Sequence, residues 1–300
     1  MKNLIAHIAH ITLFALFAVT LSPAQDVVQP GLKPQKLTDN LYLLRGAGGN
    51  IAVSVGKDGP LLIDSGYATT IDGVITAVAD LSDLPIRCVI NTHWHFDHVG
   101  GNEKIGATRA AIVAHENVRK RMSSEQKLQA LDRTVPPSPQ KALPVLTFTD
   151  SATLHFNGEA VTMTHIPPAH TDGDTLVMFP NANVMHTGDI WFNGVYPFID
   201  VDAGGSIDGM IAAVDRILGM VKDDTKIIPG HGPLGTSTEL RKYREMLVKV
   251  RDNVQKLIDE GKSREEAIAA NPTAEFDADW GKGGMSPEVF TRVVYDSLKK

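Results

Sequence analysis

The residues best suited to chemistry in this chain form the run His-Trp-His-Phe-Asp-His at positions 93–98. Three imidazoles and one carboxylate within six residues are typical of a divalent metal site, because imidazole suits zinc and carboxylate oxygen accepts harder cations. With this composition the pattern arises by accident in about one such sequence in a thousand. The run therefore predicts a metal site rather than a group of unrelated surface histidines.

Three further ligand-type residues follow strand-like segments, at turns marked by glycine or proline. They are His170, Asp189 and His231. Three neutral imidazoles on one zinc ion leave a fourth position for water, which is the arrangement of a catalytic rather than a structural site. The chain has a single cysteine, Cys88, within an apolar segment, so histidines and carboxylates must supply the ligands.

The order and local sequence of these residues resemble the metallo-β-lactamase superfamily, across nearly all of the chain after its first residues. Five family motifs are matched by Asp64 in Leu-Leu-Ile-Asp-Ser-Gly, the 93–98 run, His170, Asp189 and His231. The resemblance implies an α/β fold, a four-layer αββα sandwich, with the metal site along one edge between two sheets. Additional helices are expected at the C-terminus of this chain.

The resemblance also implies how the ligands divide between two zinc ions. The first ion would take His93, His95 and His170, the second Asp97, His98 and His231, with Asp189 bridging. A dizinc-bound hydroxide would attack a carbonyl-type bond, such as that of a β-lactam, lactone or ester, in a small-molecule substrate. Asp97 would orient the attacking water, and Asp64 would hold a ligand imidazole by a hydrogen bond. Iron or manganese could replace zinc.

Three alternative functions stay open at this point. The first is a metallo-β-lactamase proper, although Phe192 stands where the best-known zinc subclass carries a lysine for the β-lactam carboxylate. The second is a mononuclear iron oxidoreductase similar to persulfide dioxygenases, and the third is a non-catalytic zinc-binding accessory protein of the periplasm. The aromatic residues Trp191, Phe192 and Tyr196 either line a substrate pocket beside the metals or belong to the core.

The glyoxalase II branch of the same family binds glutathione through basic residues on its C-terminal helices. Arg241, Lys242 and Arg244 lie on a predicted helix here, but they alternate with apolar core positions and are expected to form a solvated face. A cytosolic thioester substrate also fits poorly with an exported protein. The sequence therefore disfavours this branch.

The segments that must position the site alternate between strand-like and helix-like. Strands are predicted at 41–45, 50–55, 60–63, 86–91, 145–148, 152–156, 160–166, 175–179, 183–186 and 226–228. Helices are predicted at 70–81, after Ser206, and from about residue 237 to the end. Strands followed by a helix, twice, predict two sheets face to face with helices outside. The proline-rich stretch 122–144 predicts a surface loop or a lid.

Composition and the N-terminal segment limit the class of protein. The chain has 300 residues, 43% of them hydrophobic and 21% charged, as in an ordinary folded protein. A net charge of −6 without a basic stripe argues against a nucleic-acid partner. The apolar stretch 4–21 predicts a signal peptide cleaved after Ala24. A single domain over 25–300 is therefore expected in the periplasm or outside the cell, without stable membrane association.

Overall fold

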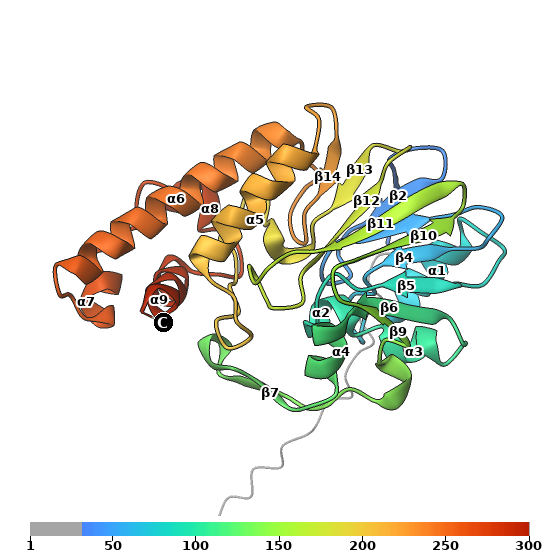
Figure 1. The fold of residues 1–300 in the computed structure, drawn as a ribbon, viewed down its shortest axis with the longest axis horizontal. Coiled ribbons are helices and arrows are strands. Elements are labelled where there is room, and N and C mark those ends of the chain that lie inside the picture. Colours follow the sequence, from blue (N-terminus) through green and yellow to red (C-terminus); the bar gives the residue numbers. More distant parts are fainter. Residues whose placement is uncertain (1–31, 300) are drawn as a thin grey trace, which may run out of the picture. The chain divides into compact units, whose positions relative to one another are not determined.

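The computed structural model describes residues 32–299, so the predicted signal peptide at 1–24 lies outside the described residues. This part of the chain has two large β-sheets that pack face to face, with helices on their outer faces (Figure 1). The first sheet contains β1 (Gln35–Lys36), β2 (Leu41–Leu44), β3 (Ile51–Ser54), β4 (Leu61–Ile63), β5 (Cys88–Ile90), β6 (Ala111–His115) and β9 (Leu146–Phe148), in that order. The second contains β10 (Ser151–Phe156), β11 (Glu159–His165), β12 (Thr175–Phe179), β13 (Val184–His186) and β14 (Lys226–Ile228), in that order.

Each sheet begins as an antiparallel meander and ends with parallel pairing. In the first sheet β1 to β4 are antiparallel, whereas β4, β5, β6 and β9 are parallel neighbours. In the second sheet β13 and β14 are parallel after three antiparallel pairs. Because parallel strands end at the same edge, β4 and β5 deliver their following loops to one place, and so do β13 and β14.

Apolar side chains fill the space between the sheets and the space under the helices. Leu43, Ile63 and Ile90 of the first sheet share one core with Val161 and Val177 of the second. The outer face of the first sheet is covered by α1 (Ile71–Ala79) and α3 (Asn102–Gly106). The second sheet is covered by α5 (Ile207–Met220), α6 (Ser237–Asp259) and α9 (Pro287–Leu298). These layers confirm the predicted αββα sandwich and the additional C-terminal helices.

The helix ends follow the local signals in the sequence. The Ser206 hydroxyl accepts a hydrogen bond from the Gly209 amide and begins α5. Ser263 and Glu266 form a capping box at the start of α7 (Arg264–Ala269). The remaining helices are α2 (Phe96–Val99), α4 (Glu116–Met122) and α8 (Asp277–Trp280).

The proline-rich stretch 122–144 contains a hairpin that the sequence did not predict. Its strands β7 (Gln126–Leu128) and β8 (Arg133–Val135) are joined by the 3₁₀ turn η1 (Gln129–Leu131). The Gln129 amide donates to Asp202 Oδ2 at 2.8 Å, and Arg292 of α9 donates to the Ala130 carbonyl at 2.7 Å. The hairpin tip is thus attached to the half of the fold that carries the C-terminal helices.

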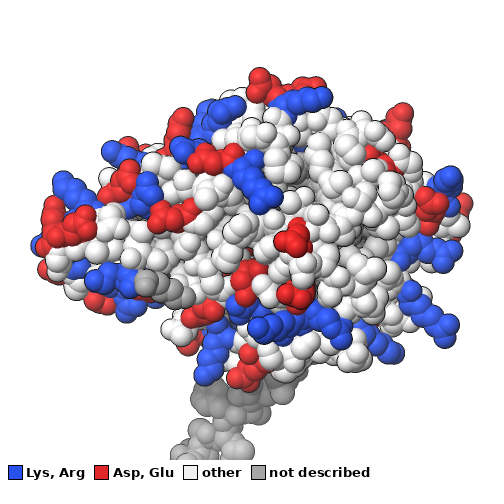
Figure 2. Space-filling model, viewed as in Figure 1, with Lys and Arg blue, Asp and Glu red and all other residues white. Residues whose placement is uncertain are grey.

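Two further features concern the surface charge and the hydropathy of the helices. Figure 2 shows positive and negative side chains intermixed over much of the face in view. Among residues 32–299, every helix is too short or too polar to cross a bilayer.

Candidate metal centre

The predicted ligands come together where strands of both sheets run out into loops. The 93–98 run follows β5, and Asp64 follows its parallel neighbour β4. Asp189 and His231 follow β13 and β14, and His170 lies in the turn between β11 and β12. All seven predicted ligands therefore meet at one edge of the sandwich.

Four of these side chains form a fully buried group. The ligand atoms of His93, His95, His170 and Asp189 all lie within 4.8 Å of one another. His170 Nε2 is 2.8 Å from His95 Nδ1 and 3.5 Å from Asp189 Oδ2, and His93 Nε2 is 3.7 Å from the same oxygen. These distances are short enough for one ion to contact the whole group.

The other three side chains form an adjoining group. The ligand atoms of Asp97, His98 and His231 also lie within 4.8 Å of one another. His231 Nε2 is 3.2 Å from Asp97 Oδ2 and 3.4 Å from His98 Nε2. Asp189 turns its second oxygen, Oδ1, toward this group, at 3.0 Å from His98 Nε2 and 3.5 Å from His231 Nε2. Asp189 thus lies between the groups, with one oxygen toward each.

One buried atom of the site, His93 Nε2, has no hydrogen-bond partner among the described residues. Asp189 Oδ1 is also buried, and the nitrogens near it belong to other predicted ligands, His98 at 3.0 Å and His231 at 3.5 Å. Unsatisfied buried polar atoms are rare in native proteins because each costs free energy of desolvation. Imidazole nitrogen and carboxylate oxygen are also the ligands that zinc takes when no thiolate is present. The residues therefore fit a divalent metal.

Hydrogen bonds behind the ligands fix which nitrogen of three of the histidines faces the cluster. His98 Nδ1 lies 2.8 Å from Asp64 Oδ2, as predicted, and His170 Nδ1 lies 2.8 Å from the Phe198 carbonyl. The His95 ring has the opposite orientation to those of His98 and His170. Its Nε2 lies 2.9 Å from Asp200 Oδ2, and its Nδ1 faces the other ligands. Such partners set the tautomer and orientation of metal-binding imidazoles.

Sequence reasoning missed Asp200. It follows the aromatic segment 191–198 and precedes Val201, with no histidine near it in the chain. Its contact with His95 spans 105 positions. The only signal was an acidic residue in an otherwise apolar stretch.

Two glycines bring the backbone close to the ligands. A Cβ atom at Gly230 would collide with Asp189 Oδ1, and one at Gly49 would collide with the His98 ring. Asp174 shapes a third loop, because its carboxylate accepts from the amides of His170 (2.7 Å) and Thr171 (2.9 Å). The loops around the cluster are therefore built to hold the ligand side chains in place.

Burial and neighbouring charges divide the histidines into two kinds. Burial lowers the pKa of His170 to about 4 and, with the nearby His98, holds the pKa of His93 well below its usual range. Burial opposes protonation of His98 and His231 too, but the Asp189 carboxylate outweighs it. The pKa of His231 is raised to about 9 and that of His98 well above its ordinary value. A metal ion would take the place of these protons, so metal binding releases protons.

A cavity of about 130 Å³ opens onto the cluster at its second group. Its apolar walls are Phe96, Leu128, Leu131, Phe192 and Phe198. The side chains of Asp97 and His231 are 14% and 28% exposed, whereas those of the other predicted ligands are at most 5% exposed. A substrate therefore reaches the cluster beside Asp97 and His231. Leu128 and Leu131 come from the hairpin and carried no signal in the sequence.

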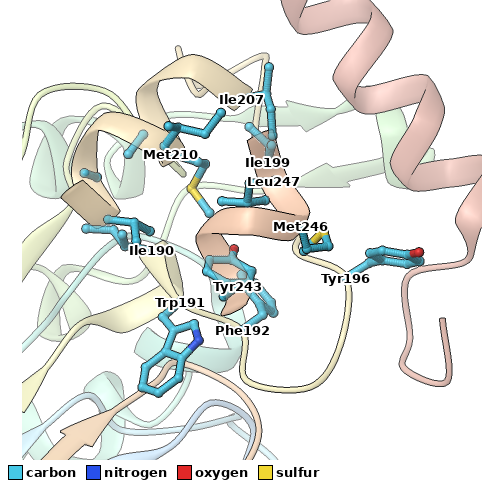
Figure 3. Close-up of a cluster of buried hydrophobic side chains, with 14 of the residues drawn as sticks. Ile190, Trp191, Phe192, Tyr196, Ile199, Ile207, Met210, Tyr243, Met246 and Leu247 are labelled. Atoms are coloured by element: carbon cyan, nitrogen blue, oxygen red, sulfur yellow. The ribbon is translucent and has the colours of Figure 1, made fainter. Parts of the chain in front are cut away.

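The pocket prediction is wrong for two of the three aromatic residues. Trp191 is fully buried and belongs to the hydrophobic cluster that also contains side chains of α5 and α6, part of which Figure 3 draws. Tyr196 stacks on Phe290 of α9 at 4.7 Å between ring centroids, and its hydroxyl donates to Asp277 Oδ1 at 2.8 Å. Both rings pack under the C-terminal helices, which the local sequence could not indicate. Phe192 does line the cavity and stacks on His231 at 5.1 Å.

Comparison with known proteins tests the family. Residues 44–242 match the family model described as the metallo-β-lactamase superfamily. The chain belongs to the metallo-β-lactamase superfamily. The metallo-β-lactamase of Pontibacter korlensis shares the fold, with a TM-score of 0.60 at 19% identity over 72% of this chain and 98% of that one. The inverting sec-alkylsulfatase of Pseudomonas sp. gives a TM-score of 0.65 at 18% identity over 88% and 50%.

Curated members of the superfamily also match by sequence. A hydroxyacylglutathione hydrolase from Polaromonas sp. is 29% identical over 189 residues, which are 61% of this chain and 64% of that protein. Another from Haemophilus influenzae is 26% identical over 155 residues, or 51% of this chain and 72% of that protein. The chain spans less than two thirds of the length of the first relative. Membership and these relatives support the prediction of a metal-dependent hydrolase.

Proposed function

We propose that this superfamily member is an exported dinuclear zinc hydrolase that opens a carbonyl-type bond in a small molecule. The observation that carries the proposal is the meeting of seven ligand-type side chains in two adjoining groups that share Asp189. His93, His95 and His170 would hold one ion, and Asp97, His98 and His231 the other. Export is proposed from the N-terminal segment 1–24 alone.

The residues around the cavity have separate tasks in such a reaction. Bound divalent metal supplies Lewis acidity and activates water at neutral pH. Burial would raise the pKa of Asp97, but protonated His98 and His231 outweigh burial and lower it. A bound cation in place of those protons would likewise keep the carboxylate ionised. Since Asp97 also borders the cavity, it accepts a hydrogen bond from the attacking water and orients it. The apolar walls exclude bulk water and place the acyl part of the substrate.

Thioesters are the first carbonyl-type substrates to test. The sequence alone disfavoured the glyoxalase II branch, but the relatives named hydroxyacylglutathione hydrolases favour a thioester substrate. Recognition of the glutathione part by α6 is not supported here. Arg244 of that helix is paired with Asp215 of α5, with Nη2 2.9 Å from Oδ2. β-Lactams are second, since Phe192 supplies no cation for their carboxylate.

The test uses the zinc-loaded protein with a thioester panel and a chromogenic cephalosporin. Asp97→Ala is expected to lose about 10²-fold or more in turnover, as for groups that position protons in catalysis. Asp72→Ala, on the exposed surface of α1, is the matched control and should keep wild-type rates. Wild-type turnover by Asp97→Ala would refute the mechanism. Bound iron together with oxygen uptake would favour the alternative of an iron oxidoreductase. Tight zinc binding without any turnover would favour the alternative of a non-catalytic zinc-binding accessory protein.

A further inference from the structure

One cation of the hairpin lies against an aromatic ring that lines the site. The guanidinium carbon of Arg133, on β8, is 3.6 Å from the centroid of the Phe96 ring. Phe96 forms a wall of the cavity at the metal ligands and also of a second, larger cavity of about 310 Å³. Arg133 lines the larger cavity. It therefore stands beside the ring that the two cavities share.

The larger cavity is lined mostly by apolar side chains, and its charged lining residues are Arg133, Arg121 and Glu103. Its apolar lining includes Trp94, Val99, Met122, Val135 and Pro137. It also holds Arg121, but this side chain makes a bidentate ion pair with Asp172, with both N···O distances 2.7 Å. Within residues 32–299, no carboxylate lies within 4.0 Å of the Arg133 guanidinium. The positive charge of Arg133 is thus free to pair with a ligand.

The stacking on Phe96 prepares Arg133 for this pairing. A guanidinium that lies over an aromatic ring keeps its N–H groups at the edge of its plane, where they can donate to a carboxylate as a fork. Tyr67 stacks on the same Phe96 ring with centroids 5.9 Å apart, which holds the ring in position. Restricting Arg133 before binding reduces the entropy that the ligand contact must offset.

We propose that Arg133 binds a carboxylate of the substrate and so selects acyl compounds that combine an apolar body with an acid group. The apolar body would lie against Phe96 in the larger cavity while the scissile bond reaches Asp97 and His231. This inference rests on the proposed hydrolase for the identity of the ligand as a substrate. In this proposal the hairpin supplies the cation that pairs with a substrate carboxylate. Phe192, which stacks on His231, cannot supply that charge.

The test compares two substrates that differ only in charge. They are the S-phenylacetyl thioester of a mercaptoalkanoic acid and its methyl ester, each with a short and a longer spacer. Arg133→Met keeps an apolar stem and removes the charge, Arg133→Lys restores a cation, and Arg216→Met removes an exposed arginine of α5 as the matched control. Arg133→Met should raise KM for the acid about three- to fivefold, the size expected of an exposed charge pair, with kcat unchanged. KM for the methyl ester should not change, and Arg133→Lys should recover part of the loss.

A binding measurement separates this inference from the proposed function. Thioether analogues, in which CH₂ replaces the thioester carbonyl, are titrated into the zinc-loaded protein by calorimetry. Tighter binding of the acid than of its methyl ester, lost in Arg133→Met but kept in Arg216→Met, supports the inference even if no substrate is turned over. Equal affinity of the wild type for both analogues, or equal weakening of both by Arg133→Met, overturns it even if the protein is an active hydrolase.

Discussion

Replacing Asp64 with asparagine isolates the contribution of one buried carboxylate to metal binding. Asp64 accepts hydrogen bonds from the Thr92 amide (2.8 Å) and hydroxyl (2.7 Å), and its Oδ2 lies 2.8 Å from His98 Nδ1. Its φ of 65° is a left-handed conformation that asparagine also adopts readily. The substitution therefore keeps the backbone and the size of the side chain and removes its charge.

An asparagine amide cannot satisfy the groups that face Asp64. In one orientation the asparagine NH₂ takes the place of the oxygen that faces His98 Nδ1. The His98 ring then keeps this contact only if Nδ1 accepts the hydrogen bond. The ring proton must move to Nε2, which is the atom 3.0 Å from Asp189. If the NH₂ replaces the other oxygen, it opposes the Thr92 amide and leaves a buried donor unpaired, at a cost of about 1–3 kcal/mol. Loss of such partners typically weakens metal binding by about 10–100-fold. We expect zinc affinity to fall within that range.

The assay is competition for zinc against a chromophoric chelator, with circular dichroism to follow the fold. Asp72→Asn removes a carboxylate of the same type from an exposed ion pair with Lys104, and its zinc affinity should stay within about twofold of wild type. The reasoning is refuted if Asp64→Asn is folded and binds zinc as tightly as wild type.

Three further predictions concern the backbone, a second carboxylate and the thiol. Gly230→Ala should weaken zinc binding and lower the melting temperature, because the added Cβ would collide with the Asp189 carboxylate. Gly219 of α5 is open to solvent, so Gly219→Ala should instead stabilise the protein against thermal unfolding by up to about 1 kcal/mol. Asp200→Asn should lower zinc affinity by about tenfold or more in the competition assay, since it removes the partner of His95; unchanged affinity would deny it that role. Burial raises the pKa of Cys88 to about 12, so at pH 8 a disulfide reagent should react only as the protein unfolds, and rapid labelling of folded protein would contradict this.

The sequence predicted most of the fold because its local signals agree with the tertiary structure. Short apolar runs bounded by glycine turns became β2 to β4, and the Ser206 cap and apolar stripe became α5. The hairpin β7–β8 was missed for the opposite reason, since prolines and polar residues hide its pairing. Its tip is held by Asp202 and Arg292, which are far away in the chain.

The ligand cluster could be predicted because the 93–98 run gathers three histidines and an aspartate, and because His170, Asp189 and His231 follow strands at turns marked by glycine or proline. The order of these motifs also resembles the superfamily. The surroundings of the cluster could not, because they depend on which distant elements meet. Asp200 reaches His95 only through the folded loop after Phe198, and nothing local distinguishes Trp191 as core from Phe192 as cavity wall. Sequence reasoning thus located the chemistry but not the groups that orient it.

The central claim is most directly tested by measuring thioester hydrolysis against bound zinc in one preparation. Metal is first removed with a chelator and zinc is then returned in steps while metal content, rate and circular dichroism are recorded. The account predicts no turnover without metal and a rate that rises until two zinc ions per chain are bound. Hydrolysis that survives chelation, or a folded protein that binds no zinc, would contradict it.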